Sequence, residues 1–182
     1  MSFRLAVLAC TVWSVATAQQ AVNQDALKIQ EFENHVADYV KLHKQAASDL
    51  DGLKPTKEPQ KITDHEQALA AKIREVRKNT RQGDIFTPPI AAEFQRLIAI
   101  TMKGERASHI RASLRHAEPV RLSLAVNDVY PRSVPLQSTP PTLLLNLPQL
   151  PKEVEYRIVG RALVLRDVDA NIVVDFIPDA IS

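Results

Sequence analysis

Two groups of histidines and carboxylates have the spacing expected of metal ligands. Glu31, His35 and Asp38 are separated by four and three residues, which places them on one side of a helix. His109 and His116 are seven residues apart, or about two helical turns. Imidazole and carboxylate ligands together suit zinc, nickel or copper. If the two helices adjoin, a metal- or small-ligand-binding site is expected; the alternative is ordinary surface pairs on solvated helices.

A second group of side chains is basic and lies in the middle of the chain. Residues 67–121 carry 11 basic and 5 acidic residues, whereas the segments on either side are acidic overall. The densest stretch contains Lys72, Arg74, Arg77, Lys78 and Arg81. It could bind an anionic polymer, phospholipid headgroups or an acidic partner, and a solvated helix face is the alternative. No aromatic residues interleave with these cations, so no nucleic-acid partner is expected.

The sequence patterns of common enzymes and metal proteins are each interrupted at a required position. The segment 167–171 begins like a calcium loop, but Ile172 occupies the glycine position, so we predict a turn between strands. His65 and Glu66 begin like a zinc-protease helix, but Leu69 stands where the second histidine is required. The glycine patterns of a nucleophile elbow or a phosphate loop do not occur. We therefore expect a non-catalytic protein with no cofactor.

The N-terminal segment, residues 1–18, has the pattern of a cleavable export signal. An apolar run over residues 5–15 follows a single arginine and precedes the small-x-small sequence Ala16-Thr17-Ala18. This run is too short for a membrane span, which needs about 20 residues. We expect cleavage to leave a periplasmic or secreted bacterial protein without a transmembrane span. Lipid attachment at Cys10, the only cysteine, is the alternative.

The first part of the mature chain, residues 19–118, is predicted to be helical. Apolar side chains recur at alternating spacings of three and four from Ile29 to Leu50, which indicates a long amphipathic helix over 23–51. The following segment contains two prolines and no apolar period. We therefore predict a loop over 52–61.

Three more helices are expected in this part, giving about four in all. Thr63 and Glu66 form a capping box that begins the second helix, which should end near Gly83 and pack antiparallel to the first. Thr87 is a suitable N-cap for the third, because a proline follows it. A thinner apolar stripe predicts the fourth helix over 105–116.

Residues 119–152 are rich in proline, which limits regular structure. We predict a strand over 120–130 and an extended segment after it. The leucines of that segment need a surface to cover. They are either a strap across the protein's own core or an exposed docking surface for an envelope protein partner. The leucines concerned are Leu143, Leu144, Leu147 and Leu150.

The C-terminal residues 153–182 predict a three-stranded antiparallel meander. Runs rich in Val, Ile and Leu cover 155–159, 162–167 and 172–177, with turn residues between them. Asp175 lies between two apolar residues on one face of the third strand, so we expect that face to be partly solvated. The meander should pack on the helical region, which gives an α+β fold.

Five motifs are distributed over nearly the whole mature chain. They are Ala37-Asp38-Tyr39-Val40, Gly83-Asp84-Ile85-Phe86, Pro140-Pro141 with Leu143-Leu144, Leu147-Pro148 with Leu150-Pro151, and the run from Glu155 to Arg161. Together they resemble a family of uncharacterised bacterial exported proteins. The resemblance implies export and carries no assigned activity. The closing meander is more loosely similar to the ends of small periplasmic proteins linked to nickel and cobalt homeostasis.

Two functions follow from the sequence. The first is a non-catalytic periplasmic interaction protein that uses the helices or the proline- and leucine-rich segment as its partner-binding surface. The second is a periplasmic metal- or small-ligand-binding protein that uses the histidines and carboxylates. Neither the partner nor the oligomeric state is determined by the sequence.

Overall fold

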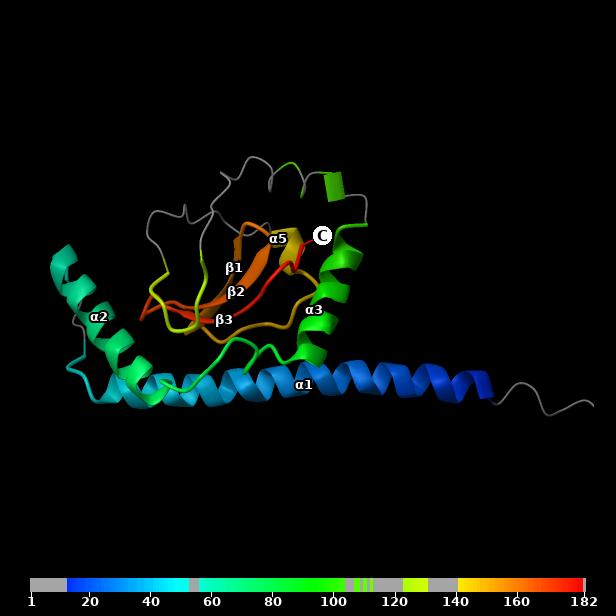
Figure 1. Ribbon diagram of the computed structural model, residues 1–182, viewed down its shortest axis with the longest axis horizontal. Helices are drawn as coiled ribbons and strands as arrows, with labels where there is room; N and C mark the ends of the chain where they lie inside the picture. The colour runs from blue at the N-terminus through cyan, green and yellow to red at the C-terminus, as the bar shows by residue number, and fades with distance from the viewer. Residues whose placement is uncertain are drawn as a thin grey trace, which may run out of the picture.

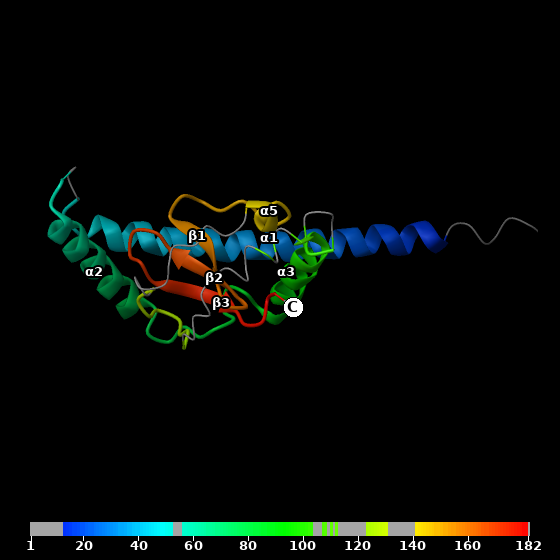
Figure 2. The same cartoon turned by 90° about the horizontal axis from the view of Figure 1, so that it is seen from above.

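The computed structural model describes residues 13–52, 56–103, 107–108, 110, 112, 123–130 and 141–181. The described helices are α1 (Trp13–Ser48), α2 (Pro59–Val76), α3 (Pro88–Thr101) and the single-turn α5 (Pro141–Leu144). The strands are β1 (Val154–Val159), β2 (Ala162–Asp167) and β3 (Val173–Ile177). In Figures 1 and 2 the sheet lies along α1, with α2 near one end and α3 near the other. The α+β class and the C-terminal antiparallel sheet are therefore confirmed.

The long helix α1 buries the seam that its apolar period predicts. Phe32, Val36, Tyr39 and His43 follow one another at spacings of four, three and four residues, and all are buried. The helix begins at Trp13 instead of residue 23, inside the predicted export signal. Among the described residues, none of the helices has both the length and the apolar character needed to cross a membrane.

Helix α2 differs from its prediction at both ends and in its packing. It begins at Pro59, because proline is favoured in the first helical turn, so the predicted loop over 52–61 is too long. It ends at Val76, whose side chain is 67% exposed and does not continue the buried stripe. In Figures 1 and 2 α2 lies oblique to α1, so the two helices do not pack side by side along their lengths as predicted.

Helix α3 begins where its sequence predicts. Thr87 is the N-cap and Pro88 the first helical residue, although the Thr87 side chain makes no capping hydrogen bond. Buried Ile90, Phe94 and Ile98 form its inner face. The fourth helix predicted over 105–116 is not confirmed, because most of that range lies outside the described residues.

The sheet has the order β1-β2-β3, with both pairs antiparallel and a bulge between Leu165 and Arg166. The predicted strand boundaries are confirmed to within one residue. One face of the sheet joins the main core against the helices, and the other covers a smaller cluster with Tyr130. Gly160 has φ +59° in the β1–β2 turn, a backbone conformation in which glycine is not strained.

The prediction that Asp175 lies on a partly solvated face is wrong. Its side chain is fully buried, and its carboxylate accepts backbone N–H hydrogen bonds from Gly83 at 2.9 Å, Ile85 at 2.8 Å and Phe86 at 2.8 Å. Opposite Leu165 and Arg166, β3 has Val174 as an extra residue, and this bulge interrupts the simple alternation of faces. The loop before α3 supplies the donors that a buried carboxylate needs. Asp175 therefore fixes the position of that loop against β3.

The described parts of the proline-rich region also differ from expectation. Residues 123–130 form a turn with only an isolated bridge between Val129 and Ile172, so the predicted strand is wrong over this range. Asn127 has φ +69°, which suits the turn better than a strand. Residues 141–144 are helical instead of extended. Residues 131–140 of the predicted extended segment lie outside the described residues.

Candidate functional site

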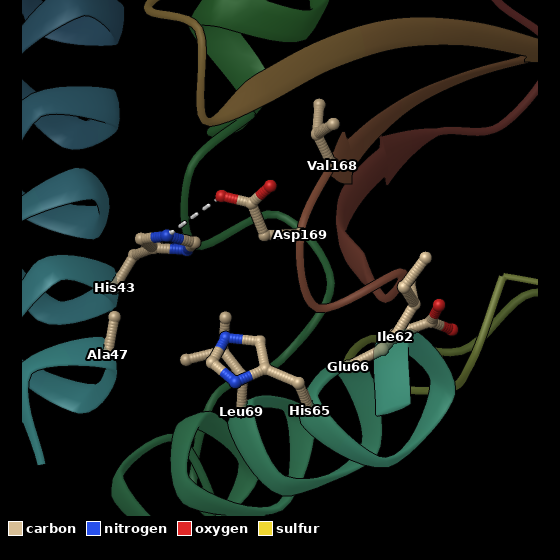
Figure 3. Close-up of a pocket in the computed structure, with 8 residues that line it drawn as sticks. All are labelled: His43, Ala47, Ile62, His65, Glu66, Leu69, Val168 and Asp169. Carbon is tan, nitrogen blue, oxygen red and sulfur yellow. Dashed lines mark ion pairs between the residues drawn. The ribbon is translucent and has the colours of Figure 1, made fainter. Parts of the chain in front are cut away.

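A pocket of about 330 Å³ lies between α1, α2 and the turn that joins β2 to β3. We call it the α1–α2 pocket. Figure 3 shows its side chains converging from these three segments. The residues that line it are His43, Ala47, Ile62, His65, Glu66, Leu69, Val168 and Asp169. Its volume is at the lower end of the range for small-molecule sites.

A buried polar cluster, formed by His43, Asp167 and Tyr39, lies behind one wall of the pocket. Nδ1 of His43 lies 2.6 Å from Oδ2 of Asp167. The Tyr39 hydroxyl donates to the same oxygen, also at 2.6 Å. Asp167 is fully buried, and His43 is only 4% exposed. Since Asp167 can only accept when ionised, it fixes the His43 tautomer with the proton on Nδ1.

The second ring nitrogen of His43 lies toward the pocket. Nε2 is 3.6 Å from Oδ2 of Asp169, which is beyond hydrogen-bond range. Figure 3 shows this ion pair reaching from α1 to the β2–β3 turn. The Asp169 side chain is 60% exposed. The pocket therefore has an oriented imidazole and a carboxylate on one wall.

A local hydrogen bond in the β2–β3 turn fixes the positions of the Asp167 and Asp169 carboxylates. Oδ1 of Asp167 accepts from the backbone N–H of Ala170 at 2.7 Å, an arrangement typical of Asp at a turn. The backbone N–H of Asp167 in turn donates to the carbonyl of Ile172 at 2.9 Å. This turn is the one predicted in place of a calcium loop. It leaves Asp167 buried and Asp169 at the surface.

The buried cluster changes the acid–base properties of its members. The hydrogen bond from His43 to Asp167 raises the pKa of His43, and this effect exceeds the opposing effect of burial. The nearby charges of Asp169 and Glu153 also raise the pKa of His43. Burial raises the pKa of Tyr39, as does the Asp167 charge. Tyr39 is therefore a neutral hydrogen-bond donor throughout the physiological range.

The remaining pocket wall is partly apolar and comes mainly from α2. Leu69 forms part of the buried core, whereas Ile62 is exposed at the opposite end. Figure 3 shows His65 turned toward α1 and Glu66 near Ile62, away from His43. Among the described residues that line the pocket, none is Lys or Arg. The pocket thus has carboxylates at Asp169 and Glu66 and apolar side chains between them.

The metal ligands predicted from spacing are not brought together. Nδ1 of His35 lies 3.2 Å from the backbone carbonyl of Ile85. Glu31 and Asp38 are exposed on α1, and Asp38 pairs with Lys41 at 3.7 Å. His109 and His116 lie outside the described residues. Within the described ranges, no group of three or more His, Cys, Asp or Glu side chains is placed to bind a metal ion.

The five predicted anion-binding residues are divided between different environments. Arg77 is buried, donates to Oδ1 of Asn127 and to the carbonyl of Val174, both at 2.9 Å, and stacks over the Tyr39 ring. Burial lowers the pKa of Arg77. Arg74 donates to the carbonyl of Asn127 at 2.7 Å, and Lys72 pairs with Asp49 at 3.4 Å.

The other two of the five cations, Lys78 and Arg81, have exposed side chains. Arg74 and Arg77 instead attach the 123–130 turn to α2 and to β3. The buried Arg77 guanidinium does not face an external anion.

The four predicted partner-binding leucines lie mainly against the protein's own core. Leu143 and Leu147 are buried, while Leu144 and Leu150 are partly buried. Leu147 also lines a second hollow of about 310 Å³ between α1, α3 and residues 145–148, which follow α5; we call it the α3–α5 hollow. This placement favours the interpretation that the segment is a strap across the protein's own core over the interpretation that it is an exposed docking surface. Among the described leucines of the segment, Leu145 is exposed, at 69%.

His43 lies within the predicted apolar seam of the first helix, but sequence reasoning missed its partners. Asp167 and Asp169 were expected only to belong to a turn. The signal that could have found Asp167 is an acidic residue at the end of an apolar run. In a continuing strand, residues two apart would share a face; because β2 ends at Asp167 and the chain turns, Asp167 is buried and Asp169 is exposed.

In three separate comparisons, no family model, no curated protein and no solved structure matches this chain.

Proposed function

We propose that this chain is a non-catalytic binding protein for a small ligand and that the α1–α2 pocket is its site. The observation that carries the proposal is the buried His43 imidazole, held through Nδ1 by Asp167 with Nε2 at the pocket wall. A binding site needs a few oriented polar groups among apolar ones, and the pocket has both. This site replaces the predicted set of Glu31, His35, Asp38, His109 and His116.

Export remains part of the proposal. Residues 1–18 have the pattern of a signal peptide, and ligand capture outside the cytoplasm is an ordinary role for a small exported protein. Sequencing the N-terminus of the protein recovered from a bacterial periplasm or growth medium tests this directly. Gln19 as the first residue is expected, and an intact N-terminus would contradict it.

The binding function is tested by a thermal-shift panel of small amines, carboxylic acids, sugars and divalent cations on the full chain. At least one class should raise the midpoint of unfolding, because a ligand of the folded state stabilises it by mass action. The shift should be lost in Asp169→Asn. It should survive in Asp179→Asn, a matched control at an exposed carboxylate in a turn remote from the pocket. If no compound shifts the wild type, the pocket is not a ligand site.

A second candidate function is the interaction with an envelope protein, and one observation favours it. Leu145 is 69% exposed at the edge of the α3–α5 hollow, where Ile29, Leu97 and Leu147 provide apolar lining. Crosslinking in intact cells should yield one reproducible partner with the wild type and none with Leu145→Asp. An unchanged partner in that variant would exclude this surface.

A further inference from the structure

The carboxylate of Asp169 lies beside the His43 imidazole at the wall of the α1–α2 pocket. It is the exposed acid nearest to the His43 imidazole in Figure 3, and its Oδ2 lies 3.6 Å from Nε2. A hydrogen bond does not join the two atoms at this distance. Nε2 therefore lies at the pocket wall and is not hydrogen-bonded to Asp169.

The protonation state of His43 decides what Asp169 can bind. When His43 is protonated, Nε2–H is positive and attracts the Asp169 carboxylate. When His43 is neutral, Nε2 carries a lone pair, and the negative charge of Asp169 is left facing the pocket. The attraction between two opposite charges at this separation is stronger near a protein surface than in bulk water.

The other charged and titratable groups around the pocket come from α1, α2 and the end of β2. On α1, Lys44 pairs with Glu153 at 3.3 Å and is largely exposed. On α2, His65 and Glu66 line the pocket. At the end of β2, the Asp167 carboxylate is hydrogen-bonded to Tyr39 and His43. With His43 neutral, the Asp169 carboxylate thus faces a pocket whose described lining residues include no Lys or Arg.

We propose that the ligand is a small organic cation bound by Asp169, and that protonated His43 competes with it for that carboxylate. This deepens the proposed function and rests on it. The apolar lining, from Ala47, Leu69 and Val168, would contact the hydrocarbon part of the ligand. The ammonium group would lie at Asp169, between His43 and His65. Ligand uptake and proton release are therefore coupled at one site.

The geometry favours an organic ammonium over a metal ion. In the described part of the chain, no three potential ligands converge as a metal would require. An alkylammonium needs only one well-placed carboxylate and an apolar surface for its chain. The pocket volume of about 330 Å³ suits a compound of a few carbon atoms better than a polymer.

The test is isothermal titration of the full chain with n-butylammonium chloride at pH 5.5 and at pH 8.5. The probe stays charged at both values, so a change in affinity reports on the protein. The affinity should be about tenfold higher at pH 8.5, a coupling of ordinary size between two sites. Titration near neutral pH in two buffers of different ionisation enthalpy should show release of protons on binding. Neutral n-butanol should not bind.

Three variants identify the groups involved. Asp169→Asn should abolish binding at both pH values. His43→Gln, which keeps a side-chain donor toward Asp167, should bind with little pH dependence. His65→Gln should retain the pH dependence of the wild type, which separates the titration of His65 from that of His43. If His43→Gln does not fold, proton release on n-butylammonium binding, measured in the wild type and in His65→Gln, tests the competition between ligand and proton.

The outcomes separate this inference from the proposed function. Equal affinity of the wild type at both pH values, with no proton release, overturns the competition. If another class of the compound panel stabilises the chain while n-butylammonium does not bind, the ligand class is wrong and the binding function stands. If no compound of any class binds, both fail together.

Discussion

Nδ1 of His43 lies 2.6 Å from Oδ2 of Asp167, although 124 residues separate them in the sequence. This contact attaches the C-terminal half of α1 to the end of β2. It also fixes the imidazole so that its other nitrogen borders the α1–α2 pocket. One buried hydrogen bond thus joins the two halves of the fold and orients the proposed site.

Replacing Asp167 with asparagine should destabilise the protein by about 3 kcal/mol, because the charge shared by two buried donors is lost. The donors concerned are Tyr39 and His43. Urea denaturation measures the change. The control is Asp169→Asn in the same turn, where an exposed side chain should change stability by less than about 0.5 kcal/mol. Equal effects of the two substitutions would remove the special role of Asp167.

The stabilising effect of His43 should depend on pH with a defined sign. The folded-state pKa of His43 is raised, chiefly by its hydrogen bond to Asp167. Its contribution to stability is therefore fully present below the unfolded pKa of about 6.5 and is lost as pH rises through the folded value. The difference in unfolding free energy between wild type and His43→Gln should be larger at pH 5 than at pH 9. The opposite trend would show that His43 is buried as a neutral group.

Arg77 should matter for folding and not for binding anions. Arg77→Ala removes donors to Asn127 and Val174 and should cost about 2 kcal/mol in unfolding free energy. The neighbouring Lys78→Ala, at an exposed position, should cost less than about 0.5 kcal/mol. Thermal or urea unfolding distinguishes the two. Similar small effects at both positions would restore the interpretation of Arg77 as part of a solvated face.

The proline- and leucine-rich segment should stabilise the core through its buried leucines. Leu143 is fully buried, so Leu143→Ala should cost about 2–5 kcal/mol. Leu145→Ala, two residues away, should be nearly neutral because that side chain is 69% exposed. A neutral Leu143→Ala would mean that the segment does not cover the core.

Local sequence patterns predicted the elements well where the structure depends on neighbouring residues. The apolar runs of the meander predicted the strands to within one residue, and Thr87 with Pro88 predicted the start of α3. The start of α2 was wrong because Pro59 was taken for part of a loop, although proline is also favoured in a first helical turn.

The contacts between distant segments could not be predicted in this way. Alternation predicts a solvated position for Asp175, but the bulge in β3 and the donors of the loop before α3 make its carboxylate a buried acceptor. The α1–α2 pocket likewise combines residues from three separate segments. Spacing along one helix predicts shared faces, and it does not reveal which faces meet.

The most direct test of the proposed site is an amide-resolved NMR titration of the full chain with n-butylammonium chloride at pH 8.5. Saturable shifts are expected at His43, Ala47, His65 and Asp169, with the amides around Leu143 unaffected. The same titration of Asp169→Asn should show no saturable shifts. Shifts that centre on the α3–α5 hollow, or that persist unchanged in the variant, would contradict the assignment of the α1–α2 pocket as the binding site.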